Sequence, residues 1–88
     1  MCFLDSKDTF LIYGRSSCPF CTRAHQLLKQ ASIECLFFDL EKDRRFLEEA
    51  KNFYGYETVP IILRLCYKSG IANFVGGCDD LEELLNVR

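Results

Sequence analysis

Short β-prone apolar runs alternate along the chain with stretches whose apolar residues recur at helical spacing. Residues 9–13 form a continuous apolar run, which predicts a strand buried on both faces, as in the core of a parallel sheet. The next stretch predicts a helix from about residue 18 to residue 30, with Pro19 in its first turn. The apolar positions that indicate this helix are Ala24, Leu27, Leu28 and Ala31.

The middle of the chain repeats this alternation. Residues 33–39 predict a second strand, and a second helix follows that ends at Gly55, a residue typical of helix C-termini. This helix is indicated by Phe46, Leu47, Ala50, Phe53 and Tyr54. The charged run at residues 41–45 before it is expected to be a solvated helix start.

The last third predicts a hairpin and a short helix. Pro60 precedes a strand at residues 61–67, and a turn at residues 68–70 connects it to a strand at residues 71–75. Asp79 and Glu82 resemble a capping box at the start of the final helix. Three leucines give this helix an apolar face, namely Leu81, Leu84 and Leu85.

The predicted order is therefore β-α-β-α-β-β-α, an α/β architecture whose first two strands are parallel and joined by a right-handed crossover. The chain has 88 residues, 49% of them hydrophobic, and shows no linker, repeat or low-complexity segment. These properties predict a single globular domain that spans residues 1–88.

The charge and the hydropathy of the chain argue against several classes of protein. The net charge is -2, and no basic block indicates a nucleic-acid partner or a membrane surface. Apolar runs are too short to span a bilayer, and the charged residues among the first nine do not resemble a signal peptide. We therefore expect a cytoplasmic protein that binds neither nucleic acid nor membrane.

Six cysteines stand at positions 2, 18, 21, 35, 66 and 78. In a secreted chain this short they would suggest three disulfides, but a cytoplasmic chain keeps most of its thiols reduced. Only Cys18 and Cys21 have a spacing that indicates chemistry. Cys2 is expected to be a terminal thiol without a role, and Cys35 and Cys66 are expected to pack in strands.

The sequence Cys18-Pro19-Phe20-Cys21 predicts a redox dithiol. Cys18 falls at the predicted helix start, where unpaired backbone N–H groups and the Arg15 charge should lower its pKa. Cys21 lies one turn further on and suits the resolution of a mixed disulfide. Two alternatives remain at this point: a pair of ordinary buried thiols, and a metal site that would also recruit Cys66 and Cys78.

Three separated motifs carry a resemblance to a known family. They are Cys18-Pro19-Phe20-Cys21, Thr58-Val59-Pro60 and Gly76-Gly77-Cys78-Asp79-Asp80. With these motifs in this order, the chain resembles a glutaredoxin of the short dithiol type. The resemblance implies a thioredoxin fold, with a four-stranded mixed sheet flanked by three helices, and glutathione as the reducing co-substrate with no tightly bound cofactor and no metal.

The resemblance also implies roles for individual residues. Cys18 would attack a disulfide and Cys21 would resolve it, while Pro60 would be cis and Val59 would offer its backbone to the cysteinyl part of glutathione. The implied glutathione-binding residues are Arg15, Phe20, Thr58, Val59, Pro60, Gly77, Cys78 and Asp79. The implied substrates are glutathionylated proteins and protein disulfides, such as that of ribonucleotide reductase, handled by a monomer.

Two further functions stay open from the sequence. One is a glutaredoxin-like protein reduced by thioredoxin reductase, which would not need the glutathione segment at residues 76–80. The other is a module that holds an iron–sulfur cluster between two chains through Cys18 and glutathione. The chain also departs from many relatives by carrying Arg15 in place of lysine, Phe20 in place of tyrosine, and a longer hairpin around residues 67–71.

Overall fold

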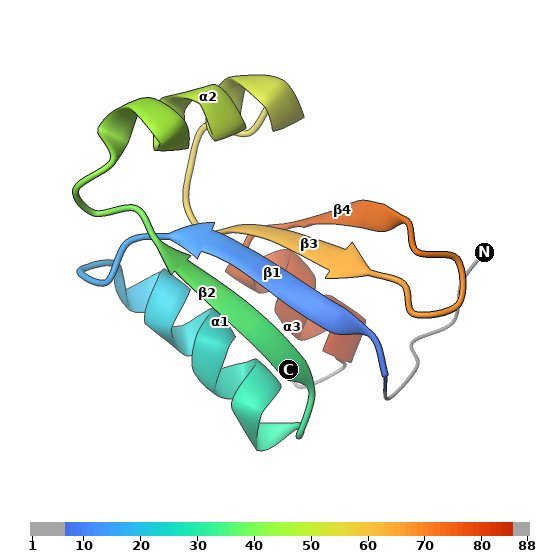
Figure 1. Ribbon diagram of the computed structural model, residues 1–88. Coiled ribbons are helices and arrows are strands. Elements are labelled where there is room, and N and C mark those ends of the chain that lie inside the picture. Colours follow the sequence, from blue (N-terminus) through green and yellow to red (C-terminus); the bar gives the residue numbers. More distant parts are fainter. Residues whose placement is uncertain (1–6, 86–88) are drawn as a thin grey trace.

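The computed structural model describes residues 7–85 as a four-stranded sheet with three helices (Figure 1). The order of elements is the predicted β-α-β-α-β-β-α. The elements are β1 Thr9–Gly14, α1 Pro19–Gln30, β2 Glu34–Asp39, α2 Arg44–Tyr54, β3 Ile61–Leu65, β4 Ala72–Gly76 and α3 Cys78–Leu85.

The sheet is mixed, with the strand order β2-β1-β3-β4. β1 is parallel to β2 and antiparallel to β3, and β3 is antiparallel to β4. Since β1 and β2 run in the same direction, their carboxyl ends meet at one edge, where Gly14 pairs with Asp39. The loop that carries the dithiol begins at this edge.

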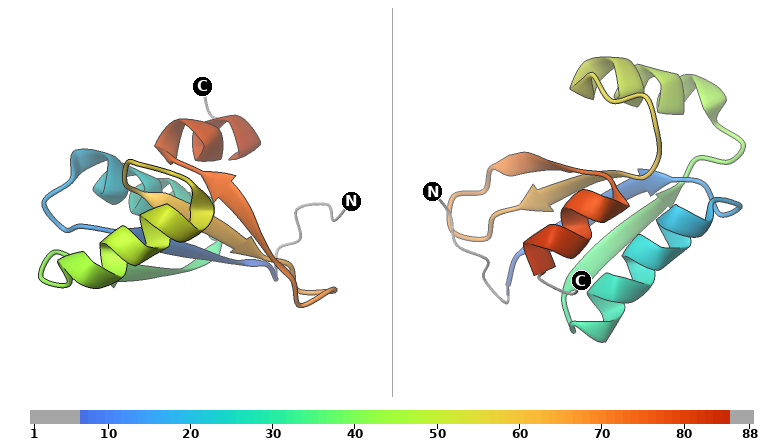
Figure 2. Two further views of the ribbon diagram at one scale, coloured as in Figure 1. Left: turned by 90° about the horizontal axis from the view of Figure 1, so that it is seen from above. Right: turned by 180° about the vertical axis from the view of Figure 1, so that it is seen from behind.

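α1 and α3 cover one face of the sheet, and α2 lies on the opposite side, beyond the carboxyl end of β1 (Figure 2). The main core lies between the sheet and the helices α1 and α3. Its buried members are Phe10, Ile12, Ala24, Leu28, Ile62, Cys78 and Leu81. This layer fixes the start of α1 relative to the start of α3.

The prediction that β1 is buried on both faces is only half right. Phe10 and Ile12 point into the core and are fully buried. Leu11 and Tyr13, on the other face, are only half-buried. The reason is that α2 covers only part of that face, where Tyr13 packs 6.0 Å from Phe46 between ring centroids.

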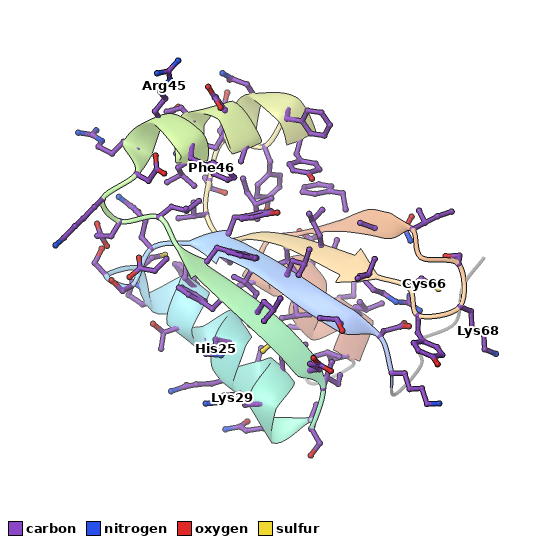
Figure 3. All side chains as sticks on the ribbon, viewed as in Figure 1. His25, Lys29, Arg45, Phe46, Cys66 and Lys68 are labelled. Carbon is purple, nitrogen blue, oxygen red and sulfur yellow. The ribbon has the colours of Figure 1, made fainter. Side chains whose placement is uncertain are left out.

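α2 packs against the sheet through aromatic side chains, such as Phe46 against Tyr13. Phe46 points from α2 toward the sheet, whereas Arg45 points away from it (Figure 3). Phe53, which the helical pattern placed on the apolar side, is 81% exposed. Gly55 ends the helix in the left-handed conformation with φ of 63°, as its position in the sequence predicts.

The helices are short, with 12, 11 and 8 residues. α1 begins at Pro19 and ends at Gln30, so Ala31 follows the helix and is exposed instead of lying on its apolar face. Within residues 7–85 no helix has the length and apolar character needed to cross a membrane.

β3 ends at Leu65, two residues earlier than predicted, because the backbone of Tyr67 is diverted from the sheet. The Tyr67 N–H donates to Asp8 Oδ1 at 2.8 Å, and Asp8 Oδ2 accepts from Arg64 Nε at 2.8 Å. Asp8 is fully buried. This carboxylate therefore joins the segment before β1 to the end of β3.

The start of α3 differs from the predicted capping box. The helix begins at Cys78, one residue before Asp79, and the Gly77 N–H donates to Asp80 Oδ2 at 2.9 Å. Asp80 is thus the residue that reaches back to the helix start, as the acidic member of a capping box does. Glu82 has a different partner, since its carboxylate pairs with Arg23 Nε of α1 at 2.8 Å.

Candidate active site

The dithiol lies where β1 passes into α1. Cys18 is the N-cap residue of α1, with extended backbone angles and no side-chain cap hydrogen bond, and its N–H donates to the Arg15 carbonyl at 3.1 Å. Pro19 occupies the first helical turn, where its missing N–H costs no hydrogen bond. Cys18 is half-buried and Cys21, one turn further along, is fully buried; both thiols are free.

Two acidic residues hold the loop in front of Cys18. The Ser16 N–H donates to Asp39 Oδ1 at 3.1 Å, and the Ser17 N–H donates to Glu41 Oε1 at 3.0 Å. Hydrogen bonds from the backbones of Glu41 and Ser16 hold the pKa of Asp39 below its usual range. Glu41 was expected only at a solvated helix start, but the parallel pairing of β1 and β2 brings both carboxylates to this loop.

Gly14 makes room for the second thiol. A Cβ atom on Gly14 would lie 2.5 Å from Cys21 Sγ, which is closer than real Cβ contacts allow. The last residue of β1 therefore has no side chain because Cys21 packs directly against it.

The structure favours the thiolate form of Cys18. Burial raises the pKa of this thiol, but hydrogen bonds from the Cys21 backbone and thiol, and from the Phe20 backbone, lower it, and so does the charge of Arg15. The lowering causes outweigh burial, so the pKa of Cys18 is below its ordinary value. This is the direction that its position at a helix N-terminus predicted.

The pKa of Cys21, in contrast, is above its ordinary value. Burial is the largest cause that raises the pKa of this thiol to about 12, and the hydrogen bond to Cys18 and the charge of Cys18 raise it further. The hydrogen bond from the Arg15 backbone and the Arg15 charge oppose the rise without reversing it. Cys18 is therefore the thiol of the pair that loses its proton more easily, and Cys21 is the thiol that stays protonated at neutral pH.

Cys18 lines a groove of about 470 Å³, a volume within the range of small-ligand sites, roughly 300–1,000 Å³. The walls come from the β1–α1 loop, α2, the loop before β3 and the first turn of α3. They are formed by Arg15, Cys18, Phe20, Lys51, Glu57, Thr58, Val59, Cys78 and Asp79. Segments more than 60 residues apart in sequence, such as those of Arg15 and Asp79, thus meet around one sulfur.

Seven of the ten site residues predicted from the sequence line this groove, and three do not. Cys21, Pro60 and Gly77 are buried behind its wall. The Gly77 N–H already donates to Asp80, so this group has a partner within the chain. The Val59–Pro60 bond is cis, as the resemblance implied, and Val59 is half-buried on the groove wall.

Lys51 and Glu57 line the groove without having been predicted. Lys51 lies on α2 and Glu57 lies in the loop before Thr58. No motif includes either residue. The packing of α2 beyond the end of β1 brings Lys51 to the groove, and Glu57 reaches the groove because it directly precedes Thr58. The groove thus contains the cations Arg15 and Lys51 and the anions Glu57 and Asp79.

The remaining cysteines have different environments. Cys35 and Cys78 are free, as expected for most of the thiols. Cys66 follows the last residue of β3 and is disulfide-bonded, so the prediction that it packs within a strand is wrong. The Cys78 thiol donates to Glu82 Oε1 at 3.5 Å, and burial followed by this bond raises the pKa of Cys78 to about 11. The prediction for Cys2 lies outside the described residues.

Within residues 7–85, no three His, Cys, Asp or Glu side chains gather into a group that could hold a metal ion.

A free dithiol at a helix start after a central strand, beside a cis-proline and a ligand-sized groove, defines a thioredoxin-fold protein of the thiol–disulfide oxidoreductase class. A family model described as Glutaredoxin matches residues 10–63, which is more than half of the chain. The chain belongs to the glutaredoxin family.

Individual relatives agree with this assignment. Glutaredoxin 1 of Rickettsia prowazekii is 36% identical over 81 residues, a match that covers 86% of this chain and 76% of that protein. The solution structure of the dithiolic glutaredoxin of Trypanosoma brucei brucei superposes with a TM-score of 0.69 at 30% identity, and covers 92% of this chain and 81% of that chain. The crystal structure of a buckwheat glutaredoxin–glutathione complex shares the fold, with a TM-score of 0.72 at 19% identity over 92% of this chain and 71% of that chain.

The chain matches only part of the length of several curated relatives. The matched segments span 65%, 76% and 69% of three curated glutaredoxins. It therefore corresponds to about two thirds to three quarters of their length.

Proposed function

We propose that this protein is a glutathione-dependent thiol–disulfide oxidoreductase with Cys18 as nucleophile and Cys21 as resolving thiol. The observation that carries the proposal is the groove beside Cys18, where two cations and an aspartate surround the thiol with the lowered pKa. A neighbour of the same fold, the buckwheat protein, has been crystallised as a complex with glutathione.

The charges of the groove suit the three charged groups of glutathione. In this proposal Arg15 and Lys51 hold the glycyl carboxylate, where Arg15 can bind both of its oxygens. The first turn of α3 receives the γ-glutamyl carboxylate through its backbone N–H groups, and Asp79 holds the γ-glutamyl amine. The backbone of Val59 pairs with the cysteinyl residue as a neighbouring strand would, and Phe20 and Thr58 complete the walls.

The first step is an exchange at Cys18. Its thiolate attacks one sulfur of a disulfide, a new sulfur–sulfur bond forms at Cys18, and the other sulfur leaves as a thiolate. With a glutathionylated protein, the attacked sulfur is that of glutathione, and the protein thiol is released. A second glutathione thiolate then attacks the glutathione sulfur on Cys18, which gives oxidised glutathione and returns the Cys18 thiolate.

The second route uses Cys21. Once Cys18 is part of a mixed disulfide, it no longer carries the charge that raises the pKa of Cys21. Cys21 then loses its proton more readily, attacks the Cys18 sulfur and expels the substrate as a thiolate. Two glutathione molecules reduce the resulting Cys18–Cys21 disulfide, and one molecule of oxidised glutathione is formed.

The wider biological setting stays a prediction. We propose glutathionylated and disulfide-containing proteins as substrates, with ribonucleotide reductase as one candidate, and a monomeric enzyme in the cytoplasm. The free thiols at positions 18, 21, 35 and 78 suit a reducing compartment, whereas the disulfide at Cys66 does not.

Replacing Asp79 tests the glutathione site. In an assay with glutathione, glutathione reductase and a small glutathionylated disulfide, Asp79→Ala should raise the KM for glutathione several-fold to about tenfold, because a charge-assisted hydrogen bond is lost. Asp80 and not Asp79 accepts the hydrogen bond from Gly77, so the helix start should survive.

The matched control is Glu83→Ala, which removes an exposed carboxylate from the same helix outside the groove. It should leave this KM unchanged. An Asp79→Ala variant with the wild-type KM would show that glutathione does not bind in the proposed orientation.

A further inference from the structure

Glu57 is not used by the proposed glutathione site. Among the described residues that line the groove, four carry acidic or basic side chains. Arg15 and Lys51 match a carboxylate of the tripeptide and Asp79 matches its amine. Glu57 is left as an exposed carboxylate on the wall beside Thr58, and no group of glutathione pairs with it.

A second hollow adjoins the groove on the side of Glu57. It has a volume of about 420 Å³, and Lys51 and Glu57 form part of both walls. Its other lining residues are Glu48, Asn52, Gly55 and Tyr56.

The charge of this second hollow is negative overall. Lys51 Nζ lies 3.6 Å from Glu48 Oε1, so the charge of the lysine is partly balanced by that carboxylate. Glu57 then contributes a further negative charge, and Tyr56 offers a half-buried ring along which the aliphatic part of a long cationic side chain can pack. These features fit a lysine or arginine side chain.

We propose that Glu57 and the hollow beside it select protein substrates that carry a lysine or arginine next to the cysteine to be reduced. The inference rests on the proposed function, because the flanking residues of a substrate reach Glu57 only when its disulfide lies at Cys18. The chemistry of exchange is unchanged, and only the binding of the substrate's polypeptide differs. An exposed carboxylate attracts such cations over about 8 Å at physiological ionic strength.

Paired peptides test the proposal. Two glutathionylated peptides that differ only in having lysine or glutamate on each side of the modified cysteine are compared by kcat/KM in the glutathione-coupled assay. The wild type should favour the lysine peptide by about threefold to tenfold at low salt, and added salt should shrink this preference. Glu57→Gln should remove most of the preference, and Glu57→Lys should reverse it.

Glu34→Gln provides a control with the same change in net charge. Glu34 is exposed and pairs with Thr9 at the far end of β1 from the groove, so this variant should keep the wild-type preference. Thermal unfolding of all variants checks that they are folded. An unchanged lysine preference in Glu57→Lys would overturn the proposal.

The mixed disulfide of glutathione and mercaptoethanol separates this inference from the function on which it rests. If the wild type reduces that small disulfide but treats both peptides alike, the selection by Glu57 is wrong and the proposed function stands. If it reduces neither the small disulfide nor the peptides, the proposed function itself is wrong.

Discussion

Replacing Cys18 by serine should reduce turnover of a glutathionylated disulfide to background, a loss on the order of 10³-fold or more, because the attacking thiolate is removed. Replacing Cys21 by serine should leave substantial turnover, since a second glutathione can regenerate Cys18 without the resolving thiol. The glutathione-coupled assay with a small glutathionylated disulfide measures both variants side by side.

The contrast between the two variants decides between the two routes. Cys35→Ser is the matched control, because Cys35 is a free thiol on β2 outside the groove and should not affect turnover. If Cys21→Ser were as inactive as Cys18→Ser, the dithiol route would be obligatory. If Cys18→Ser kept its activity, the assignment of the nucleophile would be wrong.

Asp8→Ala should lower the free energy of unfolding by about 3–5 kcal/mol, the cost of breaking a buried ion pair and leaving one partner buried. Asp8 is fully buried, and its two oxygens accept from Arg64 and from the Tyr67 N–H. Denaturant unfolding of the reduced protein measures the change.

An exposed ion pair within the same chain provides the control. Arg45 and Glu49 lie 3.7 Å apart on α2 with side chains that are 92% and 69% exposed, so Glu49→Ala should cost less than about 1 kcal/mol. Equal losses of stability in Asp8→Ala and Glu49→Ala would mean that the buried carboxylate does not join β1 to β3 as described.

The sequence predicts the order and type of every element because its hydrophobic periodicity is strong. It does not predict how far each element extends when a distant side chain intervenes. β3 stops at Leu65 because Asp8, more than 50 residues earlier, takes the Tyr67 N–H. An aspartate before a strand shows no sign in the sequence that it will be buried.

The acidic residues at the start of α3 also led to a wrong prediction of which side chain caps the helix. Three acidic residues lie within four positions there, and the capping role fell to Asp80 instead of the pair Asp79 and Glu82. The reason is that α1 brings Arg23 next to Glu82, which is a tertiary contact that no local rule contains. In the same way, Phe53 is exposed because α2 covers less of the sheet than its apolar side would allow.

The site was more predictable than its surroundings. The dithiol, the segment before Pro60 and the start of α3 are marked by motifs, and the fold brings all three together. Lys51 and Glu57 in the groove, and Asp39 and Glu41 behind the active-site loop, have no such mark. The placement of α2 brings Lys51 to the site, and Glu57 lies there because it directly precedes Thr58. The parallel register of β1 and β2 brings Asp39 and Glu41 to the active-site loop.

The central claim is that Cys18 loses its proton at a lower pH than an ordinary thiol, while Cys21 stays protonated at neutral pH. Alkylation of the reduced protein by iodoacetamide, followed for each cysteine by peptide mass spectrometry from acidic to alkaline pH, tests it most directly. Cys18 should react at least about tenfold faster than Cys21 at neutral pH, and its rate should fall only as the pH drops through its own lowered pKa. Cys21, with a pKa of about 12, should react only in strongly alkaline solution. Equal rates for the two thiols, or a Cys18 rate that follows an ordinary free thiol, would contradict the account.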